Sequence, residues 1–373
     1  MPNPEKFIAN VKPLQESMDG DYYLLRDIPE VFRALQAMGA PEYIDYDYLL
    51  SVSGMAVKLA WQPGWAGREG LSNQADFLNE DSNATLKRVL DLAGARYTIK
   101  TVAETGIEAA KNDIMSSIDR GVPVLLREES CSWFTVLGYS DDELYGVSIF
   151  TDKKKRLPPH GYNKLEDWRD KLEAYLLIDA FEPRAMDAAL LLDTLKTAVR
   201  LARTTRVDRH GDTALGTASF DAVAEMMVWD EGFEPLDNHK NPKKNKRYEG
   251  ELSFPYERPE GYYRTDGART LCERFYTGYC DFLCMLNGYC SFARFLDKYA
   301  SLLPAHSKRL REAAGYYSRA CDYADELWKY VTNDGKGVAK FKNKDVRYAF
   351  AAHMLRAKIY TIKAVEILEE VIR

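Results

Sequence analysis

The chain has 373 residues, a formal net charge of −6 at pH 7 and a hydrophobic fraction of 46%. This length exceeds that of one typical core and predicts two domains, and the acidic balance argues against general nucleic-acid binding. No apolar run approaches the roughly 20 residues of a membrane span, and the N-terminus lacks the apolar core of a signal peptide. We therefore expect a cytoplasmic protein that binds neither nucleic acid nor a membrane. Homo-oligomerisation is left open.

Five of the six cysteines fall between Cys272 and Cys321. So few cysteines in a chain of this length do not resemble the disulfide framework of a small secreted domain. We therefore expect reduced, mostly buried thiols. A zinc site at Cys272, Cys280, Cys284 and Cys290 is a weaker alternative, because no C-x-x-C pair is present and aromatic and apolar residues surround these thiols.

Start and stop signals mark two helices in the first third of the chain. The sequence DIPE at 27–30 offers a capping aspartate and a first-turn proline, and Gly39 ends the helix that follows. Ser82 or Asn83 begins a second helix, which ends at Gly94.

Between these helices, the segment 55–61 (MAVKLAW) alternates apolar residues with small or polar ones, which favours a strand. Trp61 and Trp65 then flank a Pro-Gly turn. Two tryptophans beside a turn either line a ligand pocket or close the edge of a core, and the second arrangement is the more common one.

The segment 95–150 contains the elements of a sheet. Strands are expected at 97–102, 122–126 and 133–137, with a helix closed by Gly121 between the first two. Ser140, Asp141 and Asp142 provide a turn before a further strand at Tyr145. A short helix at 165–172 and a last strand at 174–181 complete a domain of class α+β.

From Arg184 onward the apolar period is helical. Helices are expected at 185–205, 219–229, about 265–303, 307–331 and 344–372, with a long loop at 238–260. Gly278 and Gly288 predict a bend or break in the third of these helices. We therefore divide the chain into an α+β domain at 1–182 and an α-helical bundle at 183–373.

Several segments together resemble a known family. They are GVPVLL at 121–126, SWFTVLGYSDDELYGVSIF at 132–150, YDYLLSVSGMAVKLAW at 46–61, and GTASFDAVAEMM and EAAGYYSRACDYADELWKYV in the helical half. This pattern is similar to papain-like bacteriocin-processing peptidases and related acyltransferases, and most of all to the butirosin-biosynthesis-H type. The resemblance implies a papain-like first domain followed by a helical domain.

Active members of such a family are expected to transfer or hydrolyse acyl groups. The resemblance implies a cysteine at the N-terminus of the first helix, paired with a histidine at the start of the later strand. Here the segment from Tyr22 to Asp27 contains no cysteine, and Ser132 stands where the histidine is expected. Because serine cannot take up the thiol proton, the catalytic pair does not transfer to this chain.

Catalysis could instead use a cysteine and a histidine at other positions of the first domain. Cys131 and His160 are the cysteine and histidine of the first domain. Cys131 directly precedes the lost histidine position, but a buried structural cysteine and an exposed loop histidine explain the same residues.

Three functional hypotheses follow, and none of them requires a cofactor or a metal. The first is a catalytically degenerate papain-like protein that binds a small molecule or an acyl-bearing partner in the former active-site cleft. The second is an active acyltransferase or amide hydrolase that uses Cys131, and the third is an interaction module acting through the helical domain. The candidate cleft residues are Asp21, Tyr22, Trp61, Trp65, Glu128, Ser132 and Trp133.

Overall fold

The computed structural model describes residues 5–8, 11, 27–61, 81, 83–128, 133–147, 162–165, 167–207, 213–228, 271–328, 340 and 343–373, with the backbone alone at Glu128 and 271–281. The chain forms two compact units, Met1–Ser53 with Asp81–Met186, and Gly54–Glu80 with Asp187–Arg373. Helices together with an antiparallel sheet make the protein α+β, as the sequence predicts. The units are not two continuous halves, because the segment that begins at Gly54 groups with the helical unit.

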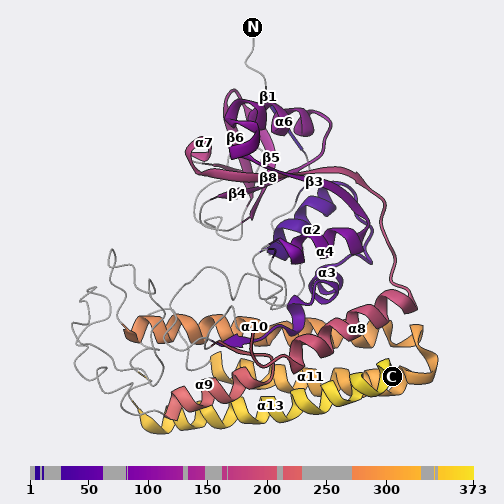
Figure 1. Ribbon diagram of the computed structural model, residues 1–373, viewed down its shortest axis with the longest axis vertical. Coiled ribbons are helices and arrows are strands. Elements are labelled where there is room, and N and C mark those ends of the chain that lie inside the picture. The colour runs from indigo at the N-terminus through magenta and orange to yellow at the C-terminus, as the bar shows by residue number, and fades with distance from the viewer. Residues whose placement is uncertain are drawn as a thin grey trace. The chain divides into compact units, whose positions relative to one another are not determined.

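The first unit contains an antiparallel sheet, which has seven strands in the part of the chain that the structure describes (Figure 1). Its main path runs through β3 (Ala95–Thr101), β8 (Leu172–Phe181), β4 (Val124–Glu128), β5 (Trp133–Ser140), β6 (Glu143–Val147) and β7 (Asn163–Lys164). The short strand β1 (Glu5–Phe7) pairs with the far end of β5. The expected turn at Asp141-Asp142 joins β5 to β6, and Asp141 has a φ of 54° there.

One face of this sheet is covered by α6 (Ile107–Asp119), which follows the single turn α5 (Val102–Thr105). Ile114 and Ile118 of α6 pack in one core cluster with Val124, Leu126 and Val136 of the sheet. This face therefore buries the apolar residues that alternate along β4 and β5.

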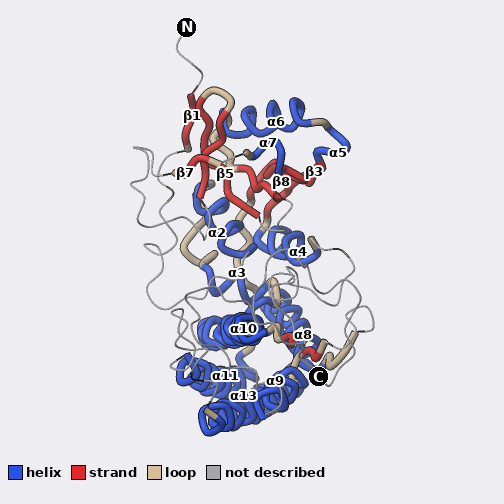
Figure 2. Tube along the Cα trace, turned by 90° about the vertical axis from the view of Figure 1, so that its left-hand side faces the viewer, coloured by secondary structure: helices blue, strands red, loops and turns tan. Residues whose placement is uncertain are grey.

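Figure 2 shows α2 (Asp27–Ala37) and α4 (Ala84–Ala93) on the other side of the sheet from α6. Between them in sequence lies α3 (Tyr46–Val52), whose N-cap Asp45 accepts a hydrogen bond from the backbone of Tyr48. The predicted stop of α4 is confirmed: Gly94 has a φ of +92°. A Cβ atom at Gly94 would lie 2.0 Å from the backbone oxygen of Glu182, so only glycine fits this contact.

The helix expected at 165–172 is much shorter in the structure. Only Trp168–Lys171 form a helical turn, α7, and β8 already begins at Leu172. Leu172 pairs with Glu128 of β4, and this backbone pairing extends the strand at the expense of the helix.

The second unit is helical, with α8 (Ala188–Arg203), α9 (Ala218–Val228), α10 (Leu271–Tyr299), α11 (Ser307–Trp328) and α13 (Lys344–Ile372). Two short 3₁₀ turns, η6 (Ala300–Leu302) and η7 (Pro304–His306), join α10 to α11. The long helices α10, α11 and α13 run side by side in both views (Figures 1 and 2). Within the described residues, no helix is apolar over a length sufficient to span a membrane.

The strand expected at 55–61 is mostly wrong. Met55–Val57 form the 3₁₀ helix η1, and only Ala60–Trp61 form a strand, β2, which pairs with β9 (Ala214–Leu215). The backbone of η1 packs directly on α10, where a Cβ at Gly288 would lie 2.8 Å from the oxygen of Ala56. The expected break at Gly288 is therefore absent, because this glycine allows close packing and α10 continues through it.

The expectation that the cysteines are reduced is wrong at one pair. Cys290 of α10 and Cys321 of α11 form a disulfide with a Cα–Cα distance of 5.7 Å. Cys284 is half-buried and is not disulfide-bonded. Helix packing decides this pairing, since it brings together two residues 31 positions apart.

Candidate functional site

The first turn of α2 is attached to the start of β5 by one buried carboxylate. Oε2 of Glu30 accepts hydrogen bonds from the backbone nitrogen (3.0 Å) and the hydroxyl (2.6 Å) of Thr135. Oε1 of Glu30 forms an ion pair of 2.9 Å with Nη1 of Arg33. The beginning of α2 and the beginning of β5 therefore lie against each other, although they are far apart in the sequence.

The environment of this carboxylate is strongly desolvated. Burial raises the pKa of Glu30 above its ordinary value, while the charge of Arg33 and the hydrogen bonds from Thr135 act in the opposite direction. Arg33 is itself buried. Because Glu30 is fully buried and both its oxygens are occupied, it holds α2 in place and is not offered to a ligand.

The alternation of strands determines which side chains share the face of α2. Leu126 packs on the α6 side of the sheet, so its neighbour Arg127 points to the opposite side. Trp133 is the register partner of Arg127 and precedes Thr135 by two residues. Arg127 and Trp133 therefore lie on the face that α2 covers, at the end of the sheet where α2 begins.

Arg127 and Trp133 form a cation–π pair, with the guanidinium carbon 5.7 Å from the ring centroid. Nη1 of Arg127 donates to Oδ1 of Asn83, at the start of α4, over 3.3 Å. A carboxylate oxygen of Glu173 lies 3.4 Å from Nε of Arg127. Trp133 is only 4% exposed, whereas the side chain of Arg127 is 22% exposed.

The guanidinium of Arg127 retains hydrogen-bonding capacity. Its Nε is buried and faces the Glu173 carboxylate without hydrogen-bond geometry, and its Nη1 donates to Asn83, so the capacity for a ligand lies in the other N–H groups of the fork. A guanidinium carries five N–H donors in a planar fork, a geometry that suits carboxylate and other oxyanions. This end of the sheet therefore presents a fixed, partly exposed cation beside an indole ring.

The structure locates three of the seven predicted cleft residues. Trp133 lies at this site, and Glu128 is the last residue of β4, with its backbone paired to Leu172. Trp61 belongs to the second unit, where its ring contacts Phe282 edge-on at 6.3 Å and is 4% exposed. This packing accounts for Trp61 as a core residue of the helical unit.

The other predicted positions lie outside the described residues. They are Asp21, Tyr22, Trp65 and Ser132 of the cleft, together with Cys131 and His160. Among the described residues, no group of three histidine, cysteine, aspartate or glutamate side chains could hold a metal ion.

Sequence reasoning missed Glu30, Arg33, Thr135 and Arg127. The burial of Glu30 depends on its contact with Thr135, on a strand more than 100 residues away. One signal was available, namely the hydroxyl of Thr135 among the apolar residues of the strand expected at 133–137. A buried hydroxyl requires a hydrogen-bonding partner, so this residue predicts a polar contact without naming it.

Comparison with models of known protein families finds no match for this chain. Comparison with curated proteins likewise finds no match.

Proposed function

We propose that the first unit is a catalytically degenerate papain-like domain of the butirosin-biosynthesis-H type. It binds a small molecule or an acyl-bearing partner at the end of the sheet where α2 and β5 begin. The resemblance implies that active relatives carry a cysteine just before this helix and a histidine just before this strand. In this sequence the helix is preceded by Tyr22–Arg26, without a cysteine, and the strand by Ser132.

The contact between Glu30 and Thr135 carries the proposal. It joins the start of α2 to the start of β5, the two elements whose beginnings bear the reacting groups in a papain-like enzyme. This contact supports a retained papain-like arrangement of the two elements, although the sulfur and imidazole are missing from the sequence. Binding without acyl transfer is the function that this combination favours.

Arg127 and Trp133 supply the chemistry for binding. The cation suits a carboxylate or carbonyl oxygen of a ligand, and the indole holds the guanidinium in place. An acyl group carries such an oxygen, so this pair fits the ligand class that the resemblance implies.

The binding function is tested by thermal unfolding of the full-length chain with short-chain acyl thioesters and the matching carboxylates. A ligand at 100 times its Kd is expected to raise Tm by roughly 5–10 °C, because binding to the folded state alone adds about 2.7 kcal/mol. Arg127→Gln should abolish the shift. Arg169→Gln is the matched control, because Arg169 also lies over a tryptophan, 5.2 Å from the ring of Trp168, and should leave the shift intact. A shift that persists in Arg127→Gln contradicts this site.

The absence of catalysis is tested separately with a fluorescent iodoacetamide at neutral pH, followed by peptide mapping. We expect Cys131 to react no faster than an ordinary thiol, and acyl thioesters to remain intact over hours in the presence of the protein. Fast, saturable labelling of Cys131, with thioester turnover that Cys131→Ser abolishes, would instead support the displaced-nucleophile enzyme. Ligand-independent Tm values together with inert thiols would leave the interaction module as the remaining hypothesis.

A further inference from the structure

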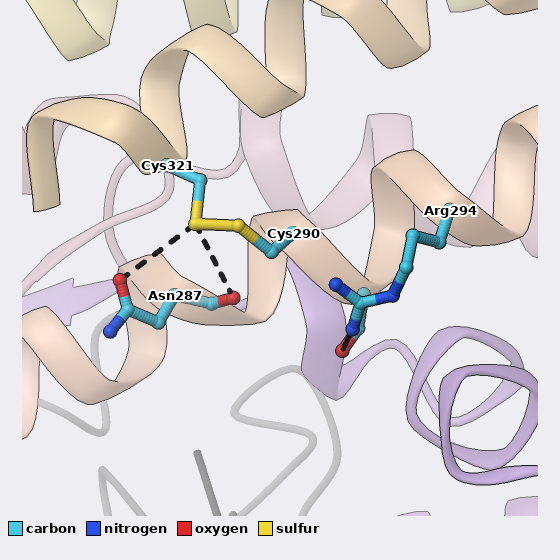
Figure 3. Close-up of a disulfide and its surroundings, with 5 residues drawn as sticks. Asn287, Cys290, Arg294 and Cys321 are labelled. Carbon is cyan, nitrogen blue, oxygen red and sulfur yellow. Dashed lines mark hydrogen bonds between the residues drawn. A yellow bond between two sulfur atoms is a disulfide. The ribbon is translucent and has the colours of Figure 1, made fainter. Parts of the chain in front are cut away.

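The disulfide between Cys290 and Cys321 lies beside the buried side-chain amide of Asn287, which is better suited to the reduced form with two thiols. Cys321 is 1% exposed and Asn287 is 3% exposed, one on α11 and the other on α10. The sulfur of Cys321 lies 3.8 Å from both the backbone oxygen and the side-chain oxygen of Asn287 (Figure 3). Two hydrogen-bond acceptors thus face one sulfur atom.

A disulfide sulfur carries no proton and cannot donate to either oxygen. The backbone oxygen of Asn287 lies inside α10, where the helix itself supplies a donor. The side-chain amide has no such supply, and its Nδ2 makes no hydrogen bond to any described residue. In the disulfide form, the buried amide of Asn287 is therefore left without good partners among the described residues, which is unfavourable.

Reduction of the disulfide gives the side chain of Asn287 a hydrogen-bond donor. A thiol at Cys321 can donate its proton to Oδ1 of Asn287 across the distance that already exists. The fold thus accommodates both states: the Cα–Cα distance of 5.7 Å allows the disulfide, and Asn287 supplies an acceptor for the thiol.

We propose that Cys290 and Cys321 are a reversible thiol–disulfide site that a dithiol reductant opens, with Asn287 stabilising the reduced form. Asn287 acts through Cys321 and is a positioning residue. When closed, the site links α10 to α11 covalently. When open, it leaves these helices held by non-covalent contacts, including the contact of Tyr289 with Tyr317 and the ion pair of Asp297 with Arg311.

Cys290 is half-buried whereas Cys321 is inaccessible, so the sulfur of Cys290 is the expected point of attack. A thiolate of the dithiol forms a bond to Sγ of Cys290, and the bond between the two protein sulfurs breaks. Cys321 leaves with the electron pair and takes up a proton. The second thiol of the reductant then displaces Cys290, so the reductant becomes a disulfide and the protein gains two thiols.

The test equilibrates the full-length protein in mixtures of reduced and oxidised dithiothreitol. Acid quenching, alkylation and peptide mass spectrometry then give the ratio of reduced to disulfide-bonded Cys290–Cys321. Asn287→Leu is expected to lower this ratio about threefold to tenfold at a given buffer composition, because the acceptor is lost. Asn287→Ala serves as a second variant if the leucine disturbs packing.

Thr194→Val is the matched control, since Thr194 is also buried in this unit and bonds within α8 to the oxygen of Leu190. It should change the ratio by less than about twofold. The proposal is overturned if both Asn287 variants match the wild type, or if they favour the thiols. It is also overturned if glutathione, a monothiol, forms its mixed disulfide on Cys321 rather than on Cys290.

Discussion

Replacing Glu30 by alanine is expected to lower the free energy of unfolding of the first unit by about 3–5 kcal/mol. The substitution removes the partner of the buried guanidinium of Arg33 and the carboxylate oxygen that accepts from both the backbone nitrogen and the hydroxyl of Thr135. An uncompensated buried charge is costly because the desolvated guanidinium loses the carboxylate that offsets its removal from water. Urea unfolding of the full-length protein, monitored by tryptophan fluorescence, measures the change.

Glu108→Ala is the control for this result. Glu108 also pairs with an arginine, at 2.7 Å from Arg169, but its side chain is 69% exposed. Exposed ion pairs contribute little, so the control should cost less than about 1 kcal/mol. Equal effects of the two substitutions would mean that Glu30 does not hold α2 to β5.

The same carboxylate predicts a dependence of stability on pH. Burial raises the folded-state pKa of Glu30 above its ordinary value of 4.5, so the folded protein binds this proton more tightly than the unfolded chain does. The resulting stabilisation is fully present below pH 4.5 and is lost as the pH rises through the folded-state pKa. The difference in unfolding free energy between wild type and Glu30→Gln should therefore decrease from pH 4 upward, and a difference that increases would contradict the assignment.

Reducing the disulfide between Cys290 and Cys321 is expected to lower the stability of the helical unit by about 3.5 kcal/mol. The bond closes a loop of 31 residues and so restricts the unfolded chain. For a unit of this size the loss corresponds to a fall in Tm of roughly 7–14 °C. Calorimetry with and without dithiothreitol measures it.

The double variant Cys290→Ala/Cys321→Ala provides the reference. Its Tm should equal that of the reduced wild type within a few degrees, and it should not respond to the reductant. If the wild type also fails to respond, the covalent link does not form in solution. This outcome would also overturn the proposed role of Asn287, which requires both the thiol and the disulfide state.

Local sequence signals predicted the helices and strands of this protein more successfully than the contacts between them. Gly94 ends α4 as expected because a positive φ and a close backbone neighbour both require glycine there. Gly288 was expected to bend or break α10, and the helix is not broken there, since the same absence of a side chain also serves close packing. A glycine in isolation does not distinguish these two uses.

The residues of the candidate site likewise include some that the sequence could predict and some that it could not. Trp133 could be predicted, because aromatic residues at the start of a strand are visible in the sequence. The burial of Glu30 could not, because its partner Thr135 lies on a strand 105 residues away. The ring of Trp61 packs on Phe282 of a distant helix, and no local pattern indicated that contact.

The sequence by itself determined the two kinds of structure, since apolar periods of two and of 3.6 residues are properties of neighbouring positions. Only the tertiary structure decided that residues 54–61 join the helical unit, that Cys290 pairs with Cys321, and that one carboxylate joins α2 to β5. The physical reason is that burial, ion pairing and disulfide formation depend on groups that approach in space. Such encounters are fixed by the packing of whole elements rather than by the residues adjacent in the chain.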